Sequence, residues 1–177
     1  EEMVHSNPFL KPIYDNLEKY RSDVRKMEKL SIYALLFEMT GNNKLRITYN
    51  PVSKPLVEGY NIGISHTKGY VLLILSRHRN VAVDIEYMSN RINKIVNKFL
   101  RNDEQATDTL SQLIHWSMKE TIYKLFSAEN LDYFEMKVSP FSPKNQGAVS
   151  VKDLKEEKMQ QAYYRVNDAY VLTYAYQ

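Results

Sequence analysis

The sequence contains no cysteine among its 177 residues, which excludes a disulfide-stapled scaffold. It also has only five glycines and six prolines, which argues against a disordered or low-complexity chain. Long apolar runs are missing as well. The longest, Val71–Leu75, is far shorter than the ~20 residues that a bilayer-spanning helix needs. We therefore interpret this run as a buried strand and expect no membrane partner.

A strong charge of either sign is also absent. The 24 Lys and Arg residues against 21 Asp and Glu residues give a net charge of +3, which does not indicate a nucleic-acid partner but suits an acidic one. The first five residues lack the basic-then-apolar order of a secretion signal, so we expect the cytoplasm. What the chain does have is 14 Tyr and 6 Phe, enough for a substantial core.

Apolar periodicity and turn residues divide the chain into alternating helical and extended stretches. Pro8 and Pro12 indicate an arm or loop over residues 1–17, and Gly41 ends a helix predicted over 19–39. We expect strands at 45–49, 60–65, 70–76, 81–86, 134–138, 148–151, 162–166 and 170–176, and further helices at 92–100 and 109–126. This order predicts an α+β fold with two similar lobes.

One predicted strand carries two carboxylates on the same face. Val81–Glu86 alternates, so Asp84 and Glu86 project side by side, opposite the apolar residues. Their mutual repulsion requires a cation, a base or open water. Both a solvated edge strand and a pair of oxygen ligands for a hard cation such as Mg²⁺ fit this pattern.

Two further groups of polar residues stand out. Trp116, Glu120 and Lys124 are spaced i, i+4 and i+8, so they share one helix face, either as a core anchor with a surface ion pair or as part of a site. The run Ile64–Thr67 places a histidine between two hydroxyls at a strand end. Such a group can bind a phosphate, although a structural or exposed histidine is the simpler interpretation.

Taken together and in order, these groups are more specific than any of them alone. The pieces are Lys54-Pro55, Ile64-Ser65-His66, Val83-Asp84-Ile85-Glu86, Phe99 with Glu104, and Trp116-Ser117-Met118-Lys119-Glu120 with Lys124. Residues 54–124 thereby resemble the 4′-phosphopantetheinyl transferase superfamily. Their order and spacing look like the larger, surfactin-synthetase-activating branch rather than the short trimeric holo-acyl-carrier-protein synthases.

The resemblance implies a fold and an activity. The fold is a pseudo-dimer of two similar lobes, each a small, mainly antiparallel sheet with a packed helix, and coenzyme A binds in the cleft between them. Here the lobes are residues 1–79 and 80–177, the second with the metal site, and we expect a monomer. The implied reaction moves the 4′-phosphopantetheine arm of coenzyme A to a serine of an acidic acyl or peptidyl carrier protein with Mg²⁺, releasing adenosine 3′,5′-bisphosphate.

The resemblance also implies roles for individual residues. Asp84, Glu86 and Glu120 match metal carboxylates, and Asp84, Glu120 and Lys124 form the catalytic set. Glu120 is the first candidate base, and Lys124 is the second candidate or a clamp on the phosphate. Ser65 and His66 match residues that hold the nucleotide 3′-phosphate. Lys54 matches a coenzyme-contacting lysine, and Glu104 matches a recurrent carboxylate of unsettled role. We also predict Lys119 and Arg25 as coenzyme-binding residues; Arg25 lies on the basic side of the first helix, which either lines the cleft or is a solvated helix face.

One departure from the family pattern keeps other functions open. Tyr33 stands where the first helix of family members usually carries an arginine, and a tyrosine cannot supply a bidentate cationic grip on phosphate. A non-catalytic coenzyme A or carrier-protein binding protein is therefore a second hypothesis. A different Mg²⁺-dependent phosphate enzyme, such as a nuclease or phosphohydrolase, is the third.

Overall fold

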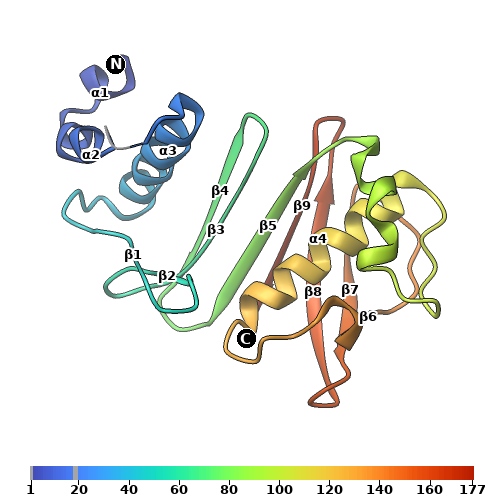
Figure 1. Cartoon of the computed structure of the whole chain (residues 1–177). Helices are drawn as coiled ribbons and strands as arrows, with labels where there is room; N and C mark the ends of the chain where they lie inside the picture. The colour runs from blue at the N-terminus through green and yellow to red at the C-terminus, as the bar shows by residue number, and fades with distance from the viewer. Residues whose placement is uncertain (1, 18–19) are drawn as a thin grey trace. The chain divides into compact units, whose positions relative to one another are not determined.

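The computed structural model describes residues 2–17 and 20–177. Internal contacts divide the chain into two compact units, residues 1–47 and residues 48–177. The first is helical. The second combines antiparallel sheets with one long helix, so the α+β class is confirmed (Figure 1).

The first unit is built from short helices packed on a longer one. Its elements are α1 (Glu2–Ser6), the 3₁₀ helix η1 (Pro8–Leu10), α2 (Lys11–Asn16) and α3 (Asp23–Thr40). The predicted arm over residues 1–17 is therefore wrong for the described residues. Both prolines occupy the first turn of a helix, where the missing N–H costs nothing, and Leu10, Ile13 and Leu17 form a buried cluster with Leu30.

α3 confirms the helix that the sequence predicts. Ser22 caps its N-terminus by accepting a hydrogen bond from the backbone N–H of Arg25, and Gly41 ends it in the left-handed conformation at φ 66°. The predicted start at residue 19 lies outside the described residues.

The second unit contains three antiparallel sheets. Their strands are β1 (Thr48–Tyr49), β2 (Pro55–Leu56), β3 (Asn61–Thr67), β4 (Tyr70–Ser76), β5 (Val81–Tyr87), β6 (Met136–Val138), β7 (Gln146–Asp153), β8 (Lys158–Val166) and β9 (Tyr170–Tyr176). β1 pairs with β2, β3 pairs with β4, and the largest sheet has the order β5-β9-β8-β7-β6. The chain's last strand therefore lies beside β5, and the register places Thr173 opposite Asp84.

One face of the five-stranded sheet is covered by α4 (Thr109–Leu125) (Figure 1). Asp108 caps this helix by accepting from the N–H of Ser111 at 2.9 Å. Ile114, Met118 and Ile122 are fully buried and pack in the main core of the unit. The same helix carries the motif that the sequence singles out, so core packing fixes the polar residues on its other positions.

Between β5 and α4 the chain forms short 3₁₀ helices rather than the predicted helix over 92–100. These are η2 (Asn90–Lys94) and η3 (Val96–Lys98), and a further 3₁₀ turn, η4 (Tyr133–Glu135), precedes β6. Among the helices within the described residues, none has both the length and the apolar character that a membrane span requires.

The β3–β4 hairpin belongs with the second unit because both strands pack against β5. Ile62 on β3 and Val81, Val83 and Ile85 on β5 are all buried in the second unit. The division into two lobes after residue 79 stays a prediction from the sequence.

Gly63 permits the close approach of β3 to β5. A Cβ atom at this position would lie 2.8 Å from Ile74 Cγ2, 3.1 Å from Ala82 Cα and 3.3 Å from the Val83 nitrogen. Two of these three atoms are backbone and cannot move aside. We expect Gly63→Ala to lower the free energy of unfolding by about 1–3 kcal/mol, as overpacking does. Urea unfolding checks this, and an unchanged midpoint would show that the strands can separate freely.

Candidate functional site

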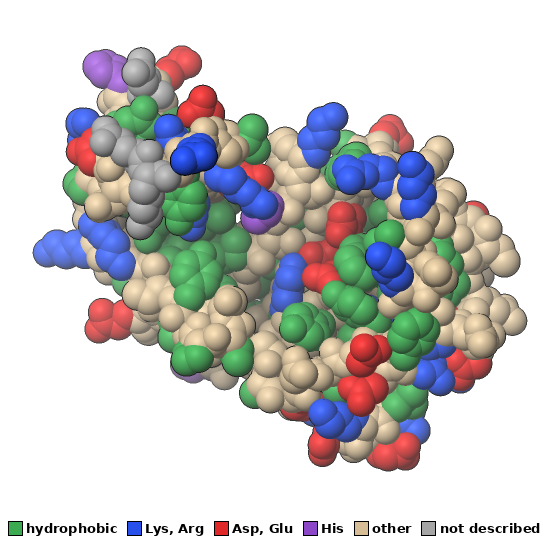
Figure 2. Space-filling view, viewed as in Figure 1, with side chains coloured by type: hydrophobic (Ala, Val, Ile, Leu, Met, Phe, Trp, Pro, Cys, Tyr) green, Lys and Arg blue, Asp and Glu red, His purple; other side chains and the backbone are tan. Residues whose placement is uncertain are grey.

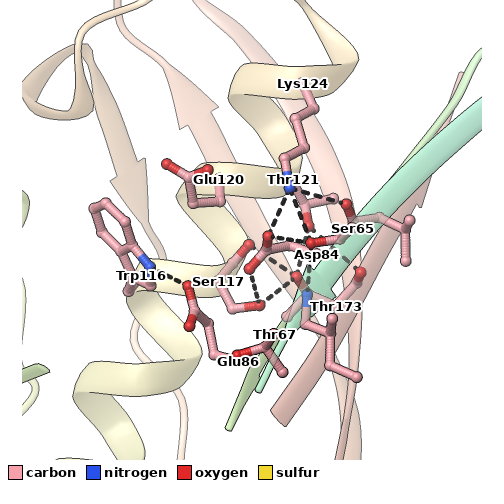
Figure 3. A network of polar contacts seen from close by, with 12 residues as sticks. Ser65, Thr67, Asp84, Glu86, Trp116, Ser117, Glu120, Thr121, Lys124 and Thr173 are labelled. Atoms are coloured by element: carbon pink, nitrogen blue, oxygen red, sulfur yellow. Dashed lines mark hydrogen bonds and ion pairs between the residues drawn. The ribbon is translucent and has the colours of Figure 1, made fainter. Parts of the chain in front are cut away.

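Asp84 is the centre of a buried polar network between β5 and α4 (Figure 3). Alternation along β5 turns it towards the helix, where only 3% of the residue is exposed. Lys124 Nζ donates to its Oδ1 at 2.6 Å and Ser65 Oγ donates to the same oxygen at 3.0 Å. Ser117 Oγ donates to Oδ2 at 2.9 Å. Both oxygens are therefore satisfied, and the carboxylate has a fixed orientation.

Three hydroxyls tie this network to β9. Ser117 Oγ lies 2.9 Å from Thr173 Oγ1, which donates to the Ser117 carbonyl at 2.8 Å and lies 2.5 Å from Thr121 Oγ1. All three residues are fully buried. These contacts hold α4 against β9 at Thr173, the residue opposite Asp84. Ser117 belongs to the motif on α4, but Thr121 and Thr173 cannot be predicted from the sequence, because the contact of α4 with β9 decides their position.

Glu86 occupies the next position on the same face of β5 and is held by Trp116. The indole Nε1–H donates to Glu86 Oε1 at 2.6 Å. Burial, reinforced by the negative charge of Asp84, raises the pKa of Glu86 to about 7, against the effect of the Trp116 hydrogen bond. Trp116 is thus a hydrogen-bond donor to the predicted carboxylate as well as an aromatic packed 5.3 Å from Phe99.

The raised pKa of Glu86 makes the stability of the metal-free protein pH-dependent. The folded state favours the neutral acid, so the associated stability is full below the unfolded pKa of about 4.5 and declines until about pH 7. We expect Glu86→Gln to remove this decline, because the amide side chain does not titrate. The amide carbonyl can still accept the hydrogen bond from Trp116. Thermal unfolding in a chelating buffer should therefore show the variant gaining on the wild type between pH 5 and pH 8.

An exposed glutamate provides the control for this measurement. Glu58 lies in the turn before β3, and Glu58→Gln should follow the wild-type melting temperature at both pH values. Parallel wild-type and Glu86→Gln curves would contradict the assignment of the pH dependence to Glu86.

Glu120 lies on α4, one turn from both Trp116 and Lys124. Tyr133 from η4 donates its phenolic hydrogen to Glu120 Oε1. Burial raises the pKa of Glu120, with a further contribution from Asp84, while the Tyr133 hydrogen bond opposes this. The sequence does not point to Tyr133, which follows the loop after α4 and belongs to no recognisable pattern.

Asp84, Glu86 and Glu120 form one electrostatically coupled group. Figure 2 shows acidic side chains gathered beside a cationic one on the surface over the region of β5 and α4. Lys124 is the cation paired with them, through Asp84. Carboxylate oxygens are the donors that Mg²⁺ prefers, so the chemistry of this set fits a divalent ion. Across the described ranges, however, no three His, Cys, Asp or Glu side chains are placed to hold one ion together. Asp84, Glu86 and Glu120 as metal ligands therefore stay a prediction that requires side-chain rearrangement.

A pocket of about 390 Å³ opens beside this group. Two lysines, Lys54 and Lys124, line it together with Tyr123 and apolar residues from β3 and β5. Burial lowers the pKa of Lys54, and its Nζ donates to Asn80 Oδ1 at 2.9 Å. Asn80 Nδ2 in turn donates to the Leu125 carbonyl at the end of α4. The combination of amines and apolar walls suits an organic anion.

The side chains of Ser65 and His66 lie on opposite faces of β3. They are neighbours on β3, and successive side chains on a strand point to opposite faces. Ser65 is 6% exposed and turned towards Asp84, whereas His66 is exposed. The hydroxyl of Ser65 donates to Asp84, and its role in holding a phosphate stays a prediction. A coenzyme-binding role for His66 stays a prediction.

Lys119 lies inside the core, which corrects its assignment as a coenzyme-binding residue. Its side chain is 0% exposed and pairs at 2.7 Å with Glu104, which is also 0% exposed. The ammonium donates further to the carbonyls of Phe99 and Tyr133. Glu104 is therefore the buried ion-pair partner of Lys119. Arg25 belongs to the first unit, where it pairs with Glu28 at 2.8 Å, and its predicted role is not tested by these contacts.

Two comparisons with known proteins bear on this site. The family model described as the 4′-phosphopantetheinyl transferase superfamily matches residues 80–175, which is just over half of the chain. The matched range includes β5 with Asp84 and Glu86, and α4 with Trp116, Glu120 and Lys124. No curated protein matched the chain.

Proposed function

The chain belongs to the 4′-phosphopantetheinyl transferase superfamily, and from that premise we propose that it transfers the 4′-phosphopantetheine arm of coenzyme A to a serine of an apo carrier protein. Enzymes of this superfamily use coenzyme A as their substrate and typically a divalent metal. We further propose Mg²⁺ as that metal and adenosine 3′,5′-bisphosphate as the product released.

One observation carries this proposal. The family match falls on the strand and the helix whose acidic side chains are coupled to one another and to a lysine. An acidic group of this kind, next to a pocket with two lysines, suits a reaction between a diphosphate and an alcohol.

The reaction balances with these residues in defined roles. The serine oxygen forms a bond to the β-phosphorus of coenzyme A, and the bond between that phosphorus and the bridging oxygen breaks. The bridging oxygen leaves with adenosine 3′,5′-bisphosphate. Glu120 accepts the serine proton as the general base.

The charges around the diphosphate are divided between two sides. Lys124 and Lys54 line the pocket and would contact the anionic phosphates as fixed cations. Asp84, Glu86 and Glu120 would hold Mg²⁺, which when bound offsets the charge of the diphosphate. We place Lys124 as a clamp rather than as the base, because its Nζ is held beside the pocket by the ion pair with Asp84 at 2.6 Å.

Several finer features belong to the same proposal. The Lys-Pro and Ser-His pieces favour the surfactin-synthetase-activating branch and its pseudo-dimeric arrangement of lobes. The net charge of +3 favours a carrier that is acidic around its serine, through electrostatic steering of the encounter. Action as a monomer in the cytoplasm stays a prediction from the sequence, and size-exclusion chromatography tests its first part.

The direct test weighs the carrier protein. The full chain is incubated with apo acyl, polyketide and peptidyl carrier proteins, coenzyme A and Mg²⁺, and intact-mass spectrometry should show a gain of one phosphopantetheine group. The matched control is the same carrier with its serine replaced by alanine, which should stay unmodified. Unchanged masses for every carrier would reject the transferase.

The same experiment separates the other two hypotheses. Binding of coenzyme A in calorimetry without any gain in carrier mass would favour a non-catalytic binding protein. Release of nucleotides or phosphate from DNA, RNA or coenzyme A in the absence of a carrier would favour a different phosphate enzyme.

A further inference from the structure

Tyr133 is a residue to which neither the sequence motifs nor the family match assigns a role. We propose that Tyr133 is the positioning residue for Glu120. Its hydrogen bond orients the carboxylate, so that one particular oxygen is left to accept a proton or contact an ion. The expected effect of Tyr133 on kcat rests on the proposed function. Its expected effect on metal affinity does not depend on turnover.

The geometry begins with one hydrogen bond between two separate segments. Tyr133 from η4 donates its phenol to Oε1 of Glu120 on α4. The phenol thereby occupies Oε1, and Oε2 is the oxygen through which Glu120 would accept a proton or contact an ion. The bond is the counterpart of the one from Trp116 to Glu86, so each outer carboxylate of the group has its own neutral donor.

Tyr133 is suited to this task because it is itself immobilised. Its ring packs 5.0 Å from Trp116 and 6.2 Å from Tyr123, measured between ring centroids. Its carbonyl accepts from the buried Lys119 at 3.1 Å. The η4 turn is closed by a capping box between Asp132 and Glu135. The phenol therefore presents its hydrogen from a rigid position.

A fixed donor matters for a glutamate more than for Asp84. Glu120 has one more rotatable bond, and a flexible carboxylate must be ordered before it can act. Partners that orient a carboxylate in this way typically change metal affinity or activity by about 10–100-fold when they are removed. Tyr133→Phe removes the hydrogen bond and keeps the ring that packs on Trp116.

The experiment compares Tyr133→Phe with Tyr163→Phe, which removes a phenol that lies on β8 and bonds to Tyr176. We expect Tyr133→Phe to lower kcat about 10–100-fold with the KM for coenzyme A changed less than about twofold. In the absence of coenzyme A and carrier, electron paramagnetic resonance of free Mn²⁺ should show binding weakened about tenfold. Tyr163→Phe should match the wild type in both.

A double-mutant cycle shows whether Tyr133 acts through Glu120. In a Glu120→Ala background, adding Tyr133→Phe should leave Mn²⁺ affinity unchanged within about twofold, because the group to be positioned is gone. A further loss as large as in the wild-type background would mean a general structural role and overturn the proposal.

The outcomes separate the two proposals. Wild-type kcat and Mn²⁺ affinity in Tyr133→Phe would overturn the positioning role and leave the transferase standing. No wild-type turnover, together with Mn²⁺ binding that weakens in Tyr133→Phe, would reject the transferase and support the positioning role. A wild type with neither turnover nor Mn²⁺ binding would overturn both.

Discussion

Glu104→Ala should unfold at much lower urea concentration than the wild type, with a loss of about 3–5 kcal/mol in the free energy of unfolding. The substitution leaves the Lys119 ammonium buried without its carboxylate partner, although both side chains are 0% exposed in the intact pair. It also removes the acceptor for the backbone N–H of Val138 at 2.6 Å and of Arg101 at 2.9 Å. One side chain thus satisfies an ion pair and two backbone donors.

An exposed pair of similar length is the control. Lys137 pairs with Asp103 at 2.8 Å, but 36% of its side chain is exposed, so Lys137→Met should cost less than about 1 kcal/mol. Lys119→Met in the Glu104→Ala background should cost far less than in the wild type, because the buried charge has already lost its partner. A small cost for Glu104→Ala itself would show that water reaches Lys119, and would reopen the assignment of this lysine to the coenzyme site.

Where the signal is local, the sequence predicts this fold well. The alternation of Val81–Glu86 and the apolar run Val71–Leu75 predict β5 and β4, and both strands are confirmed. The periodicity of 109–126 predicts α4 to within one residue of its end. In each case the pattern of residues within a single element is enough to predict its structure.

The sequence predictions are wrong where contacts between residues distant in the sequence determine the structure. Pro8 and Pro12 suggest a loop, but the helices after them form because Leu10, Ile13 and Leu17 are buried with Leu30 of α3. Such a contact overrides local propensity and cannot be read from residues 1–17 alone.

In the candidate site, too, some residues can be predicted from local patterns and others depend on tertiary contacts. Asp84, Glu86 and Glu120 can be predicted because strand alternation and helical spacing place them on defined faces. Tyr133 cannot, because its hydrogen bond to Glu120 depends on how the loop after α4 returns to the helix. The sequence assigns Lys119 to the site for a similar reason, because its neighbours in the sequence belong there. Its ion pair with Glu104 instead lies in the core.

The largest expected effect on activity comes from Asp84→Asn. The side chain keeps its shape, but it loses the charge that pairs with Lys124 at 2.6 Å, and an amide hydrogen must now face a donor. We expect kcat for carrier modification to fall at least about a hundredfold to a thousandfold, the loss seen when a preorganised electrostatic group is removed from a site. Mn²⁺ binding should weaken in parallel.

Ser117→Ala separates the charge of Asp84 from its orientation. This variant removes the hydrogen bond to Oδ2 at 2.9 Å and keeps the carboxylate and its ion pair with Lys124. A loss of about tenfold in kcat is expected, much smaller than that of Asp84→Asn. Circular dichroism and urea unfolding establish that both variants are folded before their rates are compared. If folded Asp84→Asn retained half of the wild-type rate, the charge of Asp84 would have no part in the reaction, and the proposed arrangement of acids around the diphosphate would have to be abandoned.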